Sequence, residues 1–183
     1  MTKRVDDVRK IDERTLFKTK RFAVLDAKLR IRNKVVTKPY ISHNDCAEIL
    51  AVTKSGSIVL IKSYRPEFDG YSYELPSGTL RNREKPERAA MRELEEETGY
   101  VGRKIKYMFR GYPLLGYSNC KLHFFLVTGL EKREQHLEDD ESIFAKEFRP
   151  KEILKMLEDG KIKDLCVLSA MHYYCCVLNK KSE

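Results

Sequence analysis

The chain has 183 residues, of which 42% are hydrophobic and 35% charged, so one domain with a real core is expected and complete disorder is excluded. No apolar run approaches the roughly 18 residues of a membrane-spanning helix, and no apolar stretch follows the charged N-terminus as in a secretory signal. A membrane partner is therefore not expected. The net charge of +8 resides in residues 1–40, which hold 13 Lys and Arg against 5 Asp and Glu.

The cysteines predict a reducing compartment. There are five, an odd number, and no two of them form a CxxC pair. This excludes a zinc ribbon and a thioredoxin motif, and it is typical of buried free thiols in the cytoplasm. We therefore expect a cytoplasmic protein.

Strands are predicted throughout the first third of the chain. Residues 15–41 alternate between apolar and polar side chains, with a turn at 32–34, which is typical of antiparallel strands. A hairpin is predicted over 47–53 and 57–64, because a glycine-containing turn separates two β-rich runs. Pro and Gly residues then predict loop structure over 66–83.

The remaining elements mix helices with strands. Pro86 suits the first turn of a helix and Gly99 suits its C-terminal stop, so a helix is expected from Pro86 to about Glu97. Further along, the patterns predict strands at 104–110 and 121–128, a polar loop at 133–140, and helices near 150–158 and 165–178. This order predicts an α/β (α+β) fold with a mixed sheet covered by helices.

Three glutamates share one arc of the helix predicted after Pro86. With Glu93 as origin, Glu96 lies about 60° to one side and Glu97 about 40° to the other. Like charges at this spacing destabilise a helix, and a divalent cation would cancel their repulsion. Arg92 can hold the carboxylates by paired hydrogen bonds, and Glu84 can fold back toward them. A solvated acidic face is the alternative, but the adjoining glycine loop favours a metal site.

The segment from Gly78 to Tyr100, GTLRNREKPERAAMRELEEETGY, resembles the Nudix box. That pattern is glycine, five residues, glutamate, seven residues, and R-E-U-x-E-E-x-G-U, where U is aliphatic. Eight positions match at the required spacings: Gly78, Glu84, Arg92, Glu93, Leu94, Glu96, Glu97 and Gly99. Tyr100 stands where the pattern ends on an aliphatic residue.

Other segments resemble the ADP-ribose pyrophosphatases of the same family. They are SYRP at 63–66, YELPSG at 73–78, GYS at 116–118, DESI at 140–143 and GKIKD at 160–164. Ser63 stands where those enzymes usually have glutamine, and Leu115 where they have proline. The resemblance implies a Nudix α/β/α sandwich with a mixed central sheet, preceded by an N-terminal antiparallel β region. Residues 1–44 would form that region and residues 45–183 the hydrolase domain.

The resemblance also implies an activity and its residues. Nudix hydrolases of this kind use Mg²⁺, or Mn²⁺ in its place, to hydrolyse the pyrophosphate bond of a nucleoside diphosphate linked to another group. ADP-ribose would give AMP and ribose 5-phosphate. The metal ligands would be Glu93, Glu96, Glu97 and the Ser77 carbonyl, and the catalytic residues Glu141 and Glu96. The substrate would be bound by Arg65, Glu74, Tyr117 and Ser118.

The apolar face of the predicted N-terminal strands indicates that a second copy of the chain packs against them. A small strand unit cannot bury an apolar face by itself. In the resembling family this region exchanges between two chains, so we expect a homodimer with exchanged N-terminal strands and a basic surface against the anionic substrate. Packing of the strands on their own chain's core is the alternative.

Other functions stay open. GDP-mannose, other ADP-sugars and dinucleoside polyphosphates compete with ADP-ribose as substrates. An enzyme acting on an RNA 5′ end, or a nucleic-acid binder, would use the basic N-terminus and show steep salt dependence. The few aromatic residues of that region argue against a nucleic-acid partner. A non-catalytic nucleotide sensor would usually have lost box glutamates, and none is missing here.

Overall fold

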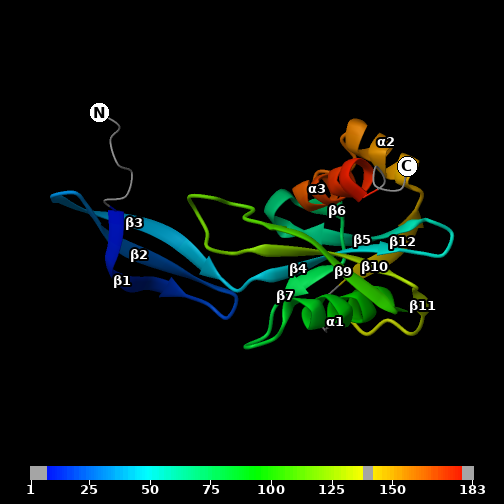
Figure 1. Ribbon diagram of the computed structural model, residues 1–183, viewed down its shortest axis with the longest axis horizontal. Helices are drawn as coiled ribbons and strands as arrows, with labels where there is room; N and C mark the ends of the chain where they lie inside the picture. The colour runs from blue at the N-terminus through cyan, green and yellow to red at the C-terminus, as the bar shows by residue number, and fades with distance from the viewer. Residues whose placement is uncertain (1–7, 138–141, 179–183) are drawn as a thin grey trace. The chain divides into compact units, whose positions relative to one another are not determined.

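The computed structural model describes residues 8–137 and 142–178 and shows two compact units (Figure 1). The first unit contains the chain up to Asp45 together with the segment Gly111–Leu122. The second contains Cys46–Arg110 and the chain from His123 onward. Within the described ranges, no helix is long and apolar enough to cross a membrane. All five cysteines are free thiols, as predicted, but of the five only Cys120 is buried.

The first unit is built on a three-stranded antiparallel sheet. Its strands follow one another in the order β1 (Val8–Lys18), β2 (Phe22–Ile31) and β3 (Lys34–His43). The strands predicted over residues 15–41 are confirmed, and β1 starts earlier than predicted. Every residue of β1 is exposed, including Leu16 and Phe17, whose exposed fractions are 51% and 57%. This sheet therefore leaves a row of apolar side chains uncovered.

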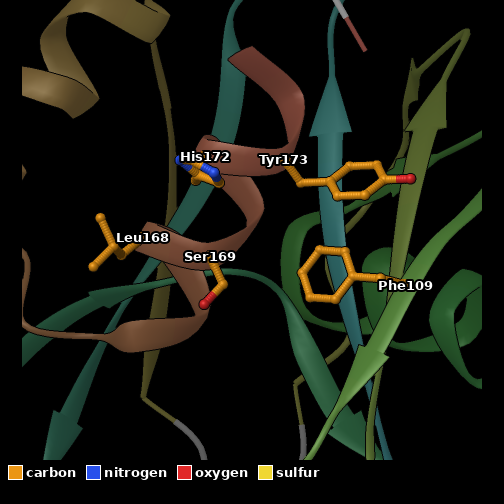
Figure 2. A pocket seen from close by; sticks show the side chains of 5 residues that line it. All are labelled: Phe109, Leu168, Ser169, His172 and Tyr173. Atoms are coloured by element: carbon orange, nitrogen blue, oxygen red, sulfur yellow. The ribbon is translucent and has the colours of Figure 1, made fainter. Parts of the chain in front are cut away.

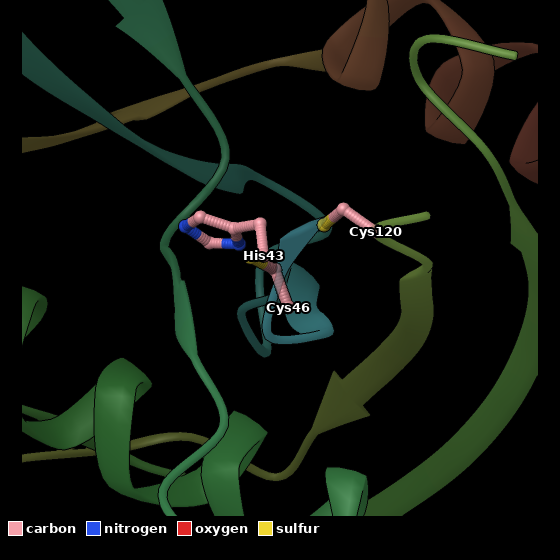
Figure 3. Close-up of side chains that lie close together, drawn as sticks. All are labelled: His43, Cys46 and Cys120. Atoms are coloured by element: carbon pink, nitrogen blue, oxygen red, sulfur yellow. The ribbon is translucent and has the colours of Figure 1, made fainter. Parts of the chain in front are cut away.

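The segment Gly111–Leu122 belongs to the first unit through contacts with β3. The Ile41 N–H donates to the Tyr117 carbonyl at 2.7 Å, and the Asn119 N–H donates to the Ile41 carbonyl at 3.2 Å. The Asn119 side chain accepts from the His43 N–H at 3.0 Å. Figure 3 shows His43 with Cys120, which follows Asn119. These bonds fix a loop from late in the sequence on the N-terminal sheet.

The second unit is built on a seven-stranded sheet. Five strands run in the order β12-β5-β4-β10-β9, and β6 and β7 pair with β5 and β4. Their bounds are β4 Cys46–Val52, β5 Ile58–Arg65, β6 Gly70–Glu74, β7 Ser77–Thr79, β9 Lys104–Gly111, β10 Leu122–Thr128 and β12 Ile143–Phe148. A separate pair joins β8 (Tyr100–Val101) to β11 (Glu131–Lys132). The predicted hairpin and the strands near 104–110 and 121–128 are confirmed.

Helices cover both faces of this sheet, as predicted. Helix α1 (Pro86–Thr98) lies on one face, and α2 (Pro150–Glu158) and α3 (Leu165–Tyr173) lie on the other (Figure 1). Gly99 ends α1 with φ of 66°, a left-handed conformation that glycine adopts without strain. The helical stretch predicted near 165–178 is confirmed, and its last part, Tyr174–Leu178, is π-helical.

One sequence prediction of irregular structure was wrong in part, and one strand was missed. Residues 66–83 are not all loop, since they contain a short 3₁₀ helix (Pro66–Phe68) and the strands β6 and β7. Gly70 begins β6 and Pro76 lies between β6 and β7, while Gly78 lies within β7 and pairs with Ala47, so none of them interrupts the pairing. Strand β12 was not predicted, because only its last residue is buried and its pairing partner is the distant β5.

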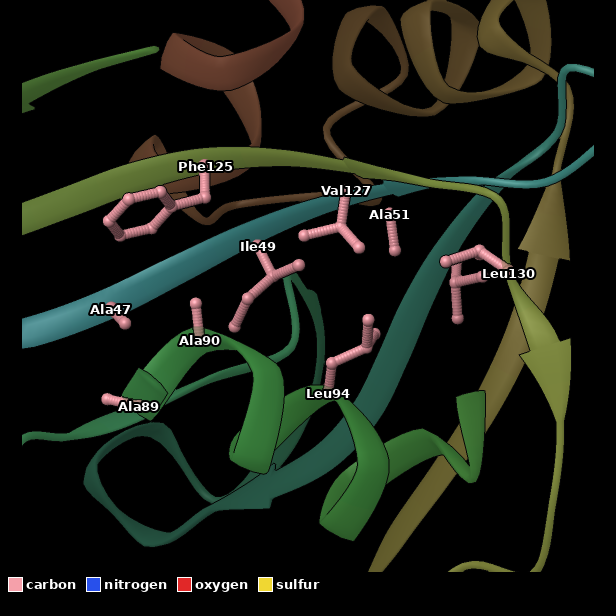
Figure 4. Close-up of a cluster of buried hydrophobic side chains, with 10 residues drawn as sticks. Ala47, Ile49, Ala51, Ala89, Ala90, Leu94, Phe125, Val127 and Leu130 are labelled. Carbon is pink, nitrogen blue, oxygen red and sulfur yellow. The ribbon is translucent and has the colours of Figure 1, made fainter. Parts of the chain in front are cut away.

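The core between α1 and the sheet holds the helix in place (Figure 4). Ala47, Ile49 and Ala51 of β4 face Ala89, Ala90 and Leu94 of α1, with Phe125 and Val127 of β10 beside them. The two helix alanines are completely buried. Their small side chains let the helix approach the sheet closely, and tight packing of this kind gives the polar face of α1 a fixed orientation.

A shallow apolar hollow lies on the opposite face, between β9 and α3. It is lined by Phe109, Leu168, Ser169, His172 and Tyr173 (Figure 2). The ring of Phe109 stacks on the ring of Phe124, with 4.3 Å between their centroids. The centroid of the Tyr173 ring lies 5.0 Å from that of Phe109. This hollow is separate from the acidic face of α1.

Candidate active site

Arg92 is the centre of the acidic cluster on α1. Its Nε and Nη2 each donate to one carboxylate oxygen of Glu84 at 3.0 Å. Its Nη1 donates to Glu93 at 2.7 Å and to Glu96 at 2.8 Å. These pairings raise the pKa of Arg92, and the hydrogen bonds to Glu84 contribute most to that rise. In return, Arg92 holds the pKa of Glu84 below its ordinary value. One guanidinium thus gathers three carboxylates, as the sequence predicted.

Glu97, on the same helix, is buried and contacts the strand that carries Ser77. Glu97 is only 5% exposed, and its Oε2 accepts the Ser77 N–H at 2.8 Å. Ser77 begins β7, which pairs with β4. The strand that carries Ser77 and the helix that carries Glu97 are therefore joined directly at the predicted metal ligands.

Gly78 gives the cluster its close contact with the backbone. A Cβ atom at this position would lie 2.5 Å from Oε2 of Glu93, and still nearer to the other carboxylate atoms. Real Cβ atoms do not approach other atoms so closely. The glycine of the box is therefore required because the Glu93 carboxylate occupies the space of its missing side chain.

The donor set fits a divalent cation. Arg92 holds the carboxylates of Glu84, Glu93 and Glu96, and Glu97 accepts the N–H of Ser77, whose neighbour Gly78 adjoins the Glu93 carboxylate. Hard divalent cations prefer such oxygen ligands. The side chains of Glu84 and Glu93 are mostly buried, at 14% and 13% exposed, so water screens their charge weakly.

Arg65 and Glu74 form a second charged pair in the same unit. The Arg65 Nε donates to the Glu74 carboxylate at 2.8 Å, and Nη2 pairs with the other carboxylate oxygen. The two residues end β5 and β6, which are paired antiparallel. Glu74 raises the pKa of Arg65 and fixes the plane of its guanidinium. Glu74 therefore orients the guanidinium of Arg65, which is a predicted substrate-binding residue.

A buried acidic group lies next to Ser77 and was missed from the sequence. Glu48 of β4 pairs in register with Ser77 and is 7% exposed. Burial, followed by the nearby Asp164, raises its pKa well above the ordinary value. Asp164 caps α3 by accepting the N–H groups of Cys166 and Val167, at 3.0 and 3.3 Å, and its pKa is also raised by burial. The sequence signal that could have revealed this group is Glu48 itself, the one charged residue in the otherwise mostly apolar strand CAEILAV.

The remaining predicted residues lie elsewhere. Tyr117 and Ser118 belong to the first unit, where Tyr117 is 72% exposed and Ser118 accepts the Cys120 N–H at 3.1 Å. Glu141 lies outside the described residues. The structure thus joins Glu93 to Glu96 through Arg92, Glu97 to Ser77, and Arg65 to Glu74.

Comparison with known proteins identifies this arrangement. The NUDIX domain family matches residues 43–168, which include the whole acidic cluster. The chain belongs to the Nudix hydrolase family. It is 31% identical over 177 residues to the ADP-ribose pyrophosphatase of Bacillus subtilis, covering 91% of this chain and 94% of that one. It is 42% identical over 71 residues to the ADP-sugar pyrophosphatase of Mus musculus, covering 39% of this chain and 33% of that one.

The fold of this Nudix hydrolase matches solved structures as well. The crystal structure of an ADP compounds hydrolase superposes with a TM-score of 0.83 at 18% identity, covering 98% of each chain. This likeness confirms the predicted fold. Nudix hydrolases generally use a divalent metal, which agrees with the donor set around Arg92.

Tyr100, the one departure from the Nudix box pattern, has contacts of its own. Its hydroxyl donates to Glu147 at 2.5 Å, and the Lys132 ammonium lies 4.2 Å from its ring centroid. Burial and the bond to Glu147 raise the pKa of Tyr100 to about 12. The aromatic ring therefore packs where an aliphatic residue would, and it adds a polar link to β12.

Proposed function

We propose that this Nudix hydrolase uses Mg²⁺ to hydrolyse the pyrophosphate bond of a nucleotide sugar, with ADP-ribose as the first candidate and AMP and ribose 5-phosphate as products. The observation that carries the proposal is the carboxylate cluster held by Arg92 against the Ser77–Gly78 backbone. The similarity to pyrophosphatases of ADP-ribose and ADP-sugars supports the choice of substrate class.

The proposed roles follow the geometry of the second unit. Glu93, Glu96, Glu97 and the Ser77 carbonyl would hold Mg²⁺ or Mn²⁺. The bound metal supplies charge neutralisation of the diphosphate and a water of lowered pKa. Arg92 orients the carboxylates of Glu84, Glu93 and Glu96, since a guanidinium remains charged at every working pH. Glu96 and Glu141 would position or deprotonate the attacking water.

Substrate binding is proposed for the charged pair of the β5–β6 hairpin and for the loop of the first unit. Arg65 offers a planar, permanently charged group suited to a diphosphate oxygen pair, and Glu74 holds its orientation. For Tyr117, which is largely exposed, and Ser118, substrate contact is proposed from the family resemblance alone.

A substrate panel tests the proposal. Purified protein with Mg²⁺ would receive ADP-ribose, another ADP-sugar, GDP-mannose, a dinucleoside polyphosphate and a 5′-triphosphorylated RNA, with products identified by mass. We expect the nucleotide sugars to be cleaved at the pyrophosphate bond, and ADP-ribose to give AMP and ribose 5-phosphate. Cleavage of the RNA alone, or binding of nucleotides without turnover, would reject the proposal.

We propose that the active form is a homodimer with exchanged N-terminal strands, in the cytoplasm. The exposed apolar residues of β1, such as Leu16 and Phe17, support a covering partner, because a three-stranded sheet gains stability by burying such a face. Light scattering at micromolar concentration tests this assembly. We expect a mass near twice the 21.5 kDa of one chain, and a mass near 21.5 kDa would contradict it.

A further inference from the structure

The C-terminal end of α1 is capped by the segment Lys132–His136, which we call the capping segment. The last carbonyl groups of a helix have no partner within the helix. Here the capping segment supplies donors to four successive carbonyls at this end: His136 N–H to Glu96 at 3.1 Å, the Gln135 side-chain amide to Glu97, Lys132 Nζ to Thr98 at 2.9 Å, and Arg133 N–H to Gly99 at 2.6 Å. The turn that carries Glu96 and Glu97 is therefore held from outside the helix.

Gly99 lets the capping segment lie directly against this helix end. A Cβ atom on Gly99 would lie 2.7 Å from the Arg133 carbonyl oxygen and 3.1 Å from the Gln135 nitrogen. With φ at +66°, the position also favours glycine for conformational reasons. The second glycine of the box thus has two functions, since it ends the helix and admits the backbone that caps it.

Gln135 differs from the other capping residues because it reaches two elements. Its Nε2 donates to the Glu97 carbonyl of α1, and it lies 3.4 Å from the carbonyl of Ile143, the first residue of β12. The Gln135 side-chain amide therefore links the last turn of α1 to the first residue of β12. Lys132, in contrast, contacts Thr98 and the ring of Tyr100.

We propose that Gln135 is a positioning residue for hydrolysis, which sets the last turn of α1 and the start of β12 at a fixed separation. This inference rests on the proposed function, since it concerns the turn that carries Glu96 and Glu97. An amide is required because both partners are carbonyl oxygens, which accept but do not donate. A carboxylate of the same shape would repel them.

The role is tested by kinetics of Gln135→Ala and Gln135→Glu in the intact protein with ADP-ribose and Mg²⁺. A misplacement of 1 Å costs roughly 100-fold in rate, so we expect kcat to fall by about 10-fold or more. KM for ADP-ribose, and the Kd for Mn²⁺ measured by electron paramagnetic resonance without substrate, should change by less than about threefold. Gln135→Glu should be at least as impaired as Gln135→Ala.

Lys132→Met is the matched control, because it removes a donor from the same helix end without touching Ile143. We expect it to keep kcat within about twofold of the wild type. Equal losses in Lys132→Met and Gln135→Ala would mean simple helix capping and would overturn the proposal, as would a Gln135→Ala protein with normal kcat. If Gln135→Ala fails to fold, Gln135→Asn, whose amide is one methylene short, is measured with the same expected result.

The outcome is distinguishable from failure of the proposed function. A wild-type protein that cleaves no nucleotide sugar would reject the proposed function, and the positioning role with it. A wild-type protein that cleaves ADP-ribose, combined with a fully active Gln135→Ala, would reject the positioning role alone.

Discussion

Replacing Gly78 by alanine tests the contact between the Glu93 carboxylate and the backbone. The added Cβ would lie 2.5 Å from Oε2 of Glu93, whereas ordinary contacts begin at 3.4 Å. The carboxylate must therefore withdraw by about 1 Å or more. The atoms it meets are the far end of a flexible side chain, so the backbone need not move.

Two magnitudes follow from this displacement. Withdrawal of Glu93 weakens its 2.7 Å bond to Arg92, and hydrogen bonds to charged groups contribute about 1.5–3 kcal/mol to stability, which is the upper limit of the loss. A shift of about 1 Å at a catalytic centre costs roughly 100-fold in rate. We therefore expect Gly78→Ala to keep its fold, with kcat reduced about 100-fold.

The assay compares kcat for ADP-ribose at saturating Mg²⁺ with the midpoint of thermal unfolding. Gly111→Ala is the matched control, because a Cβ there meets nothing within 4 Å. The reasoning would be refuted by a Gly78→Ala protein of normal kcat, or by one that no longer folds while Gly111→Ala does.

Two further substitutions test the buried and the catalytic acids. The pKa of Glu48 is raised in the folded chain, so its contribution to stability is full below the ordinary value of 4.5 and is lost as the pH rises toward the folded pKa. Glu48→Gln, measured without metal, should therefore melt at a higher temperature than the wild type at pH 7 and lose this advantage near pH 4; a pH-independent difference would contradict the burial argument. Glu141→Gln should lower kcat by about 10²–10⁴-fold, and Asp140→Asn should not; the reverse pattern would place the base at Asp140.

The sequence predicted the parts of the site whose spacing is local. Helical periodicity placed Glu93, Glu96 and Glu97 on one arc, and the structure adds that Arg92 holds two of them while Ser77 holds the third. The helix itself was predicted to within one residue, because proline and glycine mark its ends.

Contacts between distant segments could not be predicted in this way. Gln135 contacts Glu97 across 38 residues, and Asp164 influences Glu48 although the two are far apart in the sequence, so neither relation leaves a periodic signal. The short strand β7 was missed because its register depends on β4, some thirty residues earlier in the chain. Tertiary pairing, which local propensity does not encode, decided these features.

The metal site is tested most directly by measuring the turnover of ADP-ribose by the wild type and by Glu97→Gln. Each protein is assayed with saturating Mg²⁺ and again with excess chelator. Glutamine keeps the shape of Glu97 and can still accept the Ser77 N–H, so the fold should survive while the charge is lost. We predict that the wild type forms AMP and ribose 5-phosphate only when the metal is present, and that Glu97→Gln is slower by orders of magnitude. Near-normal turnover by Glu97→Gln at saturating Mg²⁺ would contradict the assignment of the metal site.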